Sequence, residues 1–147
     1  MNSPFTTSLR IEAWPDPVID RLGHAPASAY VEWLWLPVIG PSAAWAYRRL
    51  TSGLAAQPGG YQVPLSELAH WLGLGQGTGA NSTVVRTLRR LVAFQLALQV
   101  DDATLAVRRR VPPLTRRRIE RLSPYLQQTH VRLTNVSPPL GLEAEAS

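Results

Sequence analysis

The chain has 147 residues, of which 45% are hydrophobic and 17% charged. A chain of this length and composition can bury a core as one domain, and it is too apolar for a disordered protein. The absence of cysteine excludes disulfides, thiolate metal sites and a cysteine nucleophile. His24, His70 and His130 lie far apart, without a second ligand at metal-binding spacing, so we expect neither a metal site nor a cofactor.

The positive charge is concentrated in the second half of the chain. All 15 basic residues are arginines, and residues 82–132 hold eleven of them against three acids, a net charge of +8. Residues 1–81 carry −1 and residues 133–147 carry −2. Since arginine is the basic residue throughout, its distribution is more informative than its presence. A nearly neutral N-terminal half followed by a strongly basic segment indicates a polyanionic partner.

The two ends of the chain lack a sustained hydrophobic period. Residues 1–28 predict a flexible N-terminal arm, and residues 134–147 predict a disordered tail. The N-terminus has no charged start followed by an apolar run, so we expect no signal peptide. The most apolar window, residues 30–40, is too short to span a bilayer, which takes about 20 residues. We therefore expect a soluble, cytoplasmic protein outside the membrane, associated with the nucleoid if it binds DNA.

The first elements with a clear pattern lie in residues 28–56. Residues 28–36 are apolar on most sides, and their period does not decide between a short buried helix and a strand. Pro37 and the Gly40–Pro41 pair end this segment. Pro41 then opens a helix that runs to about residue 56.

The next stretch predicts a short strand, two helices and a hairpin. Tyr61–Val63 is extended, and Pro64 opens a helix with one apolar face made of Leu65, Leu68, Ala69 and Leu72. Asn81 or Ser82 caps a second helix that runs to about Phe94. Residues 96–100 and 104–109 alternate around an Asp101–Asp102 turn, which is typical of a hairpin that places Leu96, Leu98 and Val100 on one side.

A basic helix follows the hairpin. Thr115 caps the segment TRRRIERL, which Ser123–Pro124 either kinks or restarts. The apolar stripe of this segment consists of Ile119, Leu122, Tyr125 and Leu126. The sequence allows two uses for this stripe, packing on its own domain or pairing with a second copy to form a homodimer.

This element order resembles the winged helix-turn-helix superfamily over roughly residues 41–111. The pattern LSELAHWLGLG…NSTVVRTLRRL carries the resemblance. It implies a mainly α fold with a small β-hairpin wing, inside a domain of residues 29–133 that adds an N-terminal apolar segment and a C-terminal basic helix. Most members of the superfamily are DNA-binding regulators, and many bind proteins instead. The resemblance therefore implies double-stranded DNA as the partner and transcription regulation as the role.

The helix after the glycines is the predicted recognition helix. Thr83, Arg86 and Arg90 point away from its apolar stripe, with Ser82 and Arg89 at the flank. Forked guanidinium groups read guanine edges, so we expect Arg86 and Arg90 to contact bases and Arg89 to contact phosphate. Later arginines would hold the backbone. The full predicted DNA-binding set is Ser82, Thr83, Arg86, Arg89, Arg90, Arg108, Arg109, Arg110, Arg116 and Arg117.

Two other functions follow from different features. An adaptor that binds proteins would use the tryptophan-rich front and the acidic wing tip, although Trp33, Trp35 and Trp45 are expected to pack internally. A nucleotide-binding enzyme would use residues 75–80, which match G-x-G-x-x-A. That fingerprint needs a preceding strand, whereas the preceding residues have helical spacing, and the absence of lysine excludes a Walker loop. With no catalytic constellation visible, we do not expect an enzyme.

The glycine-rich turn has a simpler use. Gly73 ends the preceding helix as a left-handed cap. The remainder, to Gly79, is longer than the turn usual in this motif. It is either a flexible surface loop or a loop that orders against a phosphate backbone.

Overall fold

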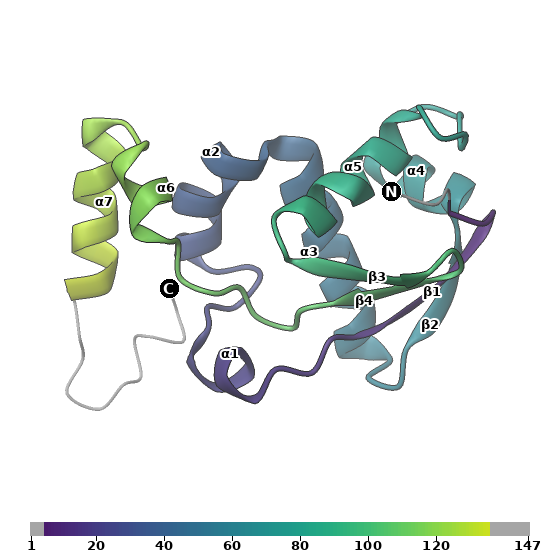
Figure 1. Cartoon of the computed structure of the whole chain (residues 1–147), viewed down its shortest axis with the longest axis horizontal. Helices are drawn as coiled ribbons and strands as arrows, with labels where there is room; N and C mark the ends of the chain where they lie inside the picture. Colours follow the sequence, from purple (N-terminus) through teal and green to yellow (C-terminus); the bar gives the residue numbers. More distant parts are fainter. Residues whose placement is uncertain (1–4, 136–147) are drawn as a thin grey trace.

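A computed structural model describes residues 5–135 as a mixed α/β fold. The sheet of this fold has four strands. It lies on one side of the molecule, with α3 (Pro41–Ala56), α4 (Leu65–Leu72) and α5 (Thr83–Ala93) packed around it (Figure 1). The last two helices, α6 (Arg116–Glu120) and α7 (Pro124–Asn135), lie at the other end. The sheet is larger than the hairpin expected of a mainly α fold, so that part of the fold prediction is corrected.

The sheet has the order β2-β1-β4-β3. Strand β1 (Ser8–Ala13) runs antiparallel to β2 (Tyr61–Pro64) and parallel to β4 (Thr104–Val107), and β4 pairs with β3 (Ala97–Asp101) as the predicted hairpin. Two positions of β1, Leu9 and Ile11, are fully buried in the core. The prediction that residues 1–28 form a flexible arm is therefore wrong for this segment, which contributes a central strand.

The chain after β1 is also ordered. Helix α1 (Pro17–Leu22) begins at Asp16, whose carboxylate accepts hydrogen bonds from the backbone N–H groups of Val18 and Ile19. His24 then forms an antiparallel β-bridge with Val111, which follows the hairpin in the chain. This N-terminal part is not an apolar segment, because the buried residues of β1 alternate with the charged residues Arg10 and Glu12, and residues 12–22 include no buried side chain.

Residues 29–39 are helical, so the predicted choice between a short buried helix and a strand is decided in favour of the helix. The π-helical segment η1 (Val31–Trp35) runs into α2 (Leu36–Ile39), and Gly40, with φ of 87°, turns the chain into α3. Trp35 is buried, but Trp33 and Trp45 are 46% and 52% exposed. The expectation that all three tryptophans pack internally is wrong for these two.

The two helices that flank the glycines begin and end as their sequences predict. Gly73 adopts a left-handed φ of 66° and caps α4. Ser82 caps α5, with its hydroxyl oxygen accepting from the Val85 N–H at 3.4 Å. The inward stripe of α5 is buried as expected and includes Val84, Val85, Leu88 and Leu91.

The hairpin differs from its predicted packing. Leu96 is buried, but Leu98 and Val100 lie exposed on β3, an edge strand of the sheet. The buried side of β3 is marked instead by Ala97. The apolar alternation therefore identified a strand correctly and assigned its faces incorrectly.

The C-terminal helices pack on their own domain. Thr115 caps α6 as predicted, and Ser123–Pro124 restarts the chain as a separate helix rather than kinking one. Leu122 is buried, Ile119 and Leu126 pack partly buried against the core, and α7 contacts η1. Helix α7 continues to Asn135, two residues into the predicted disordered tail, and the rest of that tail, residues 136–147, lies outside the described residues.

Candidate nucleic-acid interface

The outward face of α5 borders a hollow of about 280 Å³, referred to below as the Arg86 hollow. Thr83 and Arg86 on α5 are exposed at its rim, and the first turn of α3, Gly40–Ala43, forms the opposite wall. The amides of a first helical turn have no partner within the helix, and the helix dipole makes this end positive. Among the described residues, none forms a hydrogen bond or ion pair with the Arg86 guanidinium. The hollow therefore combines a free cation, a hydroxyl and a helix start, a combination that attracts anions.

Arg90 shares this face but is held by the protein. Its Nε donates to the carbonyl of Ile39 at 2.5 Å and its Nη2 donates to the carbonyl of Val38 at 3.2 Å. These are carbonyls at the C-terminal end of α2, where a cation is favourable. A guanidinium fixed in this way keeps its charge but has fewer donors to offer a base. Of the two arginines predicted to read bases, the geometry favours Arg86.

A line of arginines continues from α5 to α6. Two guanidinium groups contact the ring of Phe94, that of Arg90 at 5.0 Å and that of Arg118 at 4.4 Å from its centroid. A second hollow of about 320 Å³ is lined by Arg118, Arg121 and Phe94. We call Arg86, Arg90, Arg118 and Arg121 the basic path. Arg118 and Arg121 lie outside the ten predicted residues, although the sequence of the last basic helix allows both to act either as backbone contacts or as part of a solvated face.

Two predicted contacts are used to anchor the glycine-rich loop. The Ser82 hydroxyl donates to the carbonyl of Gly79 at 2.7 Å, in addition to capping α5. Arg89 donates from Nη1 to the carbonyl of Ala80 at 3.3 Å. The loop is thus tied to α5 at its end. The element that leads into it is helix α4, not the strand that a dinucleotide fingerprint requires.

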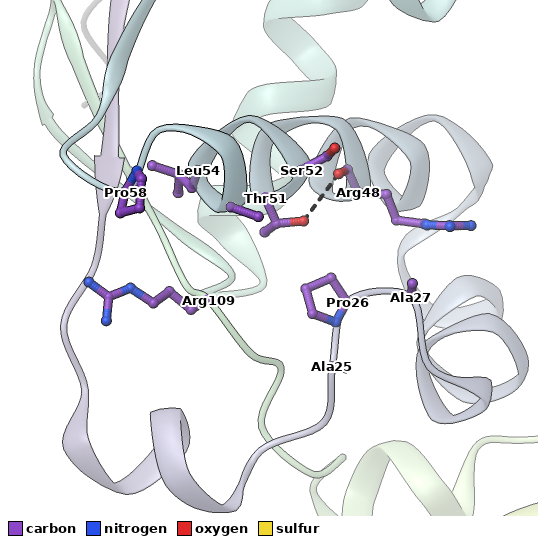
Figure 2. A pocket seen from close by; sticks show the side chains of 10 residues that line it. Ala25, Pro26, Ala27, Arg48, Thr51, Ser52, Leu54, Pro58 and Arg109 are labelled. Carbon is purple, nitrogen blue, oxygen red and sulfur yellow. Dashed lines mark hydrogen bonds between the residues drawn. The ribbon is translucent and has the colours of Figure 1, made fainter. Parts of the chain in front are cut away.

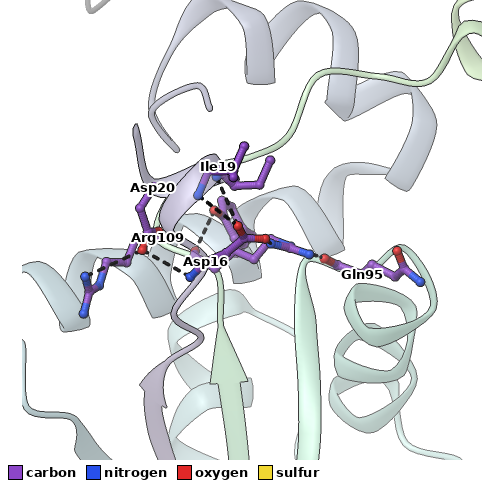
Figure 3. Close-up of polar contacts among 8 residues, drawn as sticks. Asp16, Ile19, Asp20, Gln95 and Arg109 are labelled. Atoms are coloured by element: carbon purple, nitrogen blue, oxygen red, sulfur yellow. Dashed lines mark hydrogen bonds and ion pairs between the residues drawn. The ribbon is translucent and has the colours of Figure 1, made fainter. Parts of the chain in front are cut away.

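The arginines that follow β4 hold the N-terminal segment against the sheet. The Arg108 side chain is only 12% exposed and forms an ion pair with the Asp16 carboxylate at 2.8 Å. Its Nε donates to the Gln95 carbonyl at 2.7 Å, and its guanidinium stacks on the Trp14 ring at 4.0 Å from the ring centroid. Hydrogen bonds from Arg108 and from the Ile19 N–H hold the pKa of the Asp16 carboxyl below its usual value. Figure 3 shows how Asp16, Ile19 and Gln95 converge there.

The other two arginines of this run lie on the same segment. Arg110 donates from Nε to the carbonyl of Gly23 at 2.8 Å. Arg109 is 55% exposed and lies 3.9 Å from the Asp20 carboxylate (Figure 3). The structure therefore places Arg108, Arg109 and Arg110 beside α1, and it does not bring them to the face of α5.

The remaining predicted residues are exposed. Arg116 and Arg117 occupy the first turn of α6, next to the basic path in sequence. Of the ten predicted residues, Thr83, Arg86 and Arg90 gather around one hollow, and Arg116 and Arg117 lie on the helix that continues the path.

Comparisons with known proteins find no matching family model, no similar curated protein and no similar solved structure. Within residues 5–135, no helix has the length and apolar character that crossing a membrane requires. In the same part of the chain, no three histidine or carboxylate side chains gather in a way that could hold a metal ion.

Proposed function

We propose that this protein binds double-stranded DNA as a winged helix-turn-helix regulator, with α5 as its recognition helix. The observation that carries the proposal is the exposed guanidinium of Arg86, which has no hydrogen bond or ion pair within residues 5–135 and lies beside Thr83 and the first turn of α3. The major groove of B-DNA is about 12 Å wide and admits an α-helix. An outward arginine near the start of such a helix can donate two hydrogen bonds to guanine O6 and N7.

The basic path supplies phosphate contacts in this proposal. Arg118 and Arg121 extend the positive charge of α5 along one side of the molecule, and Arg116 and Arg117 precede them. Each phosphate that is neutralised contributes about −0.9 to the slope of log K against log salt. Arg86 contacts a base in this proposal, so the four arginines at α6 together predict a slope of about −4.

The test is binding of a labelled duplex across a salt series, first with random DNA and then with a sequence selected from it. Arg118→Ala and Arg121→Ala should each reduce the slope by about 1 on any sequence. Arg86→Ala should weaken binding to the selected sequence by about 1–3 kcal/mol and random binding much less. Arg21→Ala is the matched control, because Arg21 is an exposed arginine on α1, away from α5 in Figure 1. Absent or salt-independent binding would overturn the proposal.

A second candidate function is a protein-interaction adaptor, which the exposed tryptophans favour. Trp33, Trp45 and Trp71 are 46%, 52% and 41% exposed. Trp45 and Trp71 line one hollow of about 370 Å³ together with Arg49. Tryptophan and arginine are enriched among the residues that dominate protein–protein binding energy. An adaptor without DNA binding would give no salt-dependent DNA signal, and Trp45→Ala would abolish its partner's binding while leaving the fold intact.

A further inference from the structure

A groove runs along α3 beside the loop that precedes η1, separate from the Arg86 hollow. Its volume is about 670 Å³, within the range of about 300–1,000 Å³ common for small-molecule sites. The walls are mostly apolar: residues 25–27 form one side, and Leu54 and Ala55 of α3 with Pro58 form the other. A smaller hollow of about 200 Å³ shares Pro26, Ala27 and Arg48 with it and extends it toward Trp45. We call the larger space the α3 groove.

Two arginines mark the ends of the α3 groove. Figure 2 shows Arg48 and Arg109 at opposite ends, with Pro26 and Thr51 between them. Within residues 5–135, no acidic residue lines the larger space. The Arg109 side chain is 55% exposed and lies 3.9 Å from the Asp20 carboxylate, which makes a loose ion pair. The Arg48 guanidinium stacks on Trp45 at 4.8 Å and meets no carboxylate among the described residues. The groove therefore has a guanidinium group at each end and a mostly apolar middle, and Glu32 lines the smaller hollow beyond Arg48.

This pattern selects a class of ligand. Apolar walls favour a hydrocarbon body, and a guanidinium at the mouth favours a carboxylate, with which it forms charge-assisted hydrogen bonds. A nucleotide is a poorer match, because polyphosphates need several convergent donors. Here each end offers one cation, and the central wall residue Pro26 has no N–H to donate.

We propose that the α3 groove binds a small amphipathic carboxylate, its chain against Pro26 and Leu54 and its acid group on Arg48 or Arg109. The hydroxyl of Thr51 already donates to the carbonyls of Tyr47 and Arg48 at 2.9 and 3.1 Å, so it is an acceptor toward the groove and contributes little to anion binding. The recognition of charge thus falls on the two arginines. The groove needs no DNA to bind its ligand, so this proposal stands or fails independently of the proposed function.

The experiment is calorimetric titration of the full chain with decanoate below its micellar concentration, with decanol as the uncharged control. Decanoate should bind to one site, and decanol should bind at least tenfold more weakly, because it lacks the charge-assisted contact. Arg48→Gln and Arg109→Gln keep most of the side-chain length and remove the charge. At least one of them should weaken decanoate binding about tenfold and leave decanol unchanged.

Two further variants locate the site. Arg49→Gln is the matched control, because Arg49 is the next arginine on α3 and lines the Trp45–Trp71 hollow rather than the groove. It should leave decanoate binding unchanged. Ala55→Trp fills the groove from an exposed position and should abolish binding without unfolding the protein, as checked by circular dichroism. Equal binding of decanol and decanoate, or decanoate binding that survives Ala55→Trp and both glutamine variants, would overturn the proposal.

Discussion

Gly53 lies in the last turn of α3, and replacement of a helical glycine by alanine ordinarily stabilises a helix by about 1 kcal/mol. The structure predicts the opposite sign. A Cβ atom on Gly53 would lie 2.5 Å from the hydroxyl and 2.6 Å from Cε1 of the Tyr61 ring. That ring, at the start of β2, packs over the glycine and donates a hydrogen bond to the Leu50 carbonyl at 2.9 Å. Its burial raises the pKa of the Tyr61 hydroxyl to about 12.

The cost of Gly53→Ala is the displacement of this ring. Losing the hydrogen bond to Leu50 costs about 1 kcal/mol. Exposing about half of the tyrosine surface costs about 2–3 kcal/mol at 25 cal/mol per Å². After the gain in helix propensity, the variant should be about 2 kcal/mol less stable than the native protein, which lowers the melting temperature by roughly 4–8 °C.

A double-mutant cycle measured by urea unfolding tests the reason as well as the sign. In a Tyr61→Ala background, Gly53→Ala should recover its stabilising effect of about 1 kcal/mol, a coupling energy of about 3 kcal/mol. Gly59→Ala is the control, since a Cβ atom there meets nothing within 4 Å, and it should change stability by less than about 0.5 kcal/mol. If Gly53→Ala stabilises the native protein, or if the two changes are additive, the packing of Tyr61 on α3 is not as described.

Three other predictions address the N-terminal half and α5. Burial, with smaller contributions from neighbouring cations, lowers the pKa of His24 to about 4 from about 6.5. Because the unfolded chain binds this proton more tightly than the folded protein does, the free energy of unfolding is highest above pH 6.5. It should fall by up to about 3 kcal/mol as the pH falls toward 4. His24→Phe should reduce that loss in pH-dependent thermal melts, leaving a smaller one from His130, whose pKa burial also lowers. Ile11→Ala in β1 should cost about 2–4 kcal/mol in urea unfolding and Glu12→Ala almost nothing, whereas a flexible arm would make the two equal. Ser82→Ala should cost about 1 kcal/mol through loss of the α5 cap, and an unchanged melting temperature would contradict that role.

The elements from α3 to α6 were predictable because their signals are local. Gly73 needs a left-handed φ to end α4, and Ser82 and Thr115 each cap the helix that follows. The i, i+3, i+4 spacing of apolar residues in α4 and α5 places one face of each helix in the core. In each case the decisive residue lies within four positions of the structure it specifies.

Strand β1 escaped prediction because its partners are distant. Only Leu9 and Ile11 alternate in it, a pattern too short to separate from chance. What makes it a strand is pairing with β2 on one side and with β4 on the other, segments about 50 and 95 residues away in the register. A parallel pair such as β1 with β4 has no turn to mark it in the sequence. Because β1 joins β2 to the β3–β4 hairpin, a prediction without β1 contains a small hairpin in place of the four-stranded sheet.

The individual roles of the arginines were unpredictable for a related reason. In the sequence, Arg86 and Arg90 are equivalent, one turn apart on the same helical face. Their difference arises from the carbonyls of Val38 and Ile39, about 50 residues away, which occupy Arg90 and not Arg86. Arg108 is likewise occupied by Asp16, 92 residues away. An arginine whose donors are satisfied by protein acceptors gains little free energy from binding a phosphate, because it would exchange one set of hydrogen bonds for another. The number of phosphates that the protein can contact therefore depends on how many guanidinium groups the fold leaves unpaired on one face. That number is smaller than the net charge of +8 over residues 82–132 suggests.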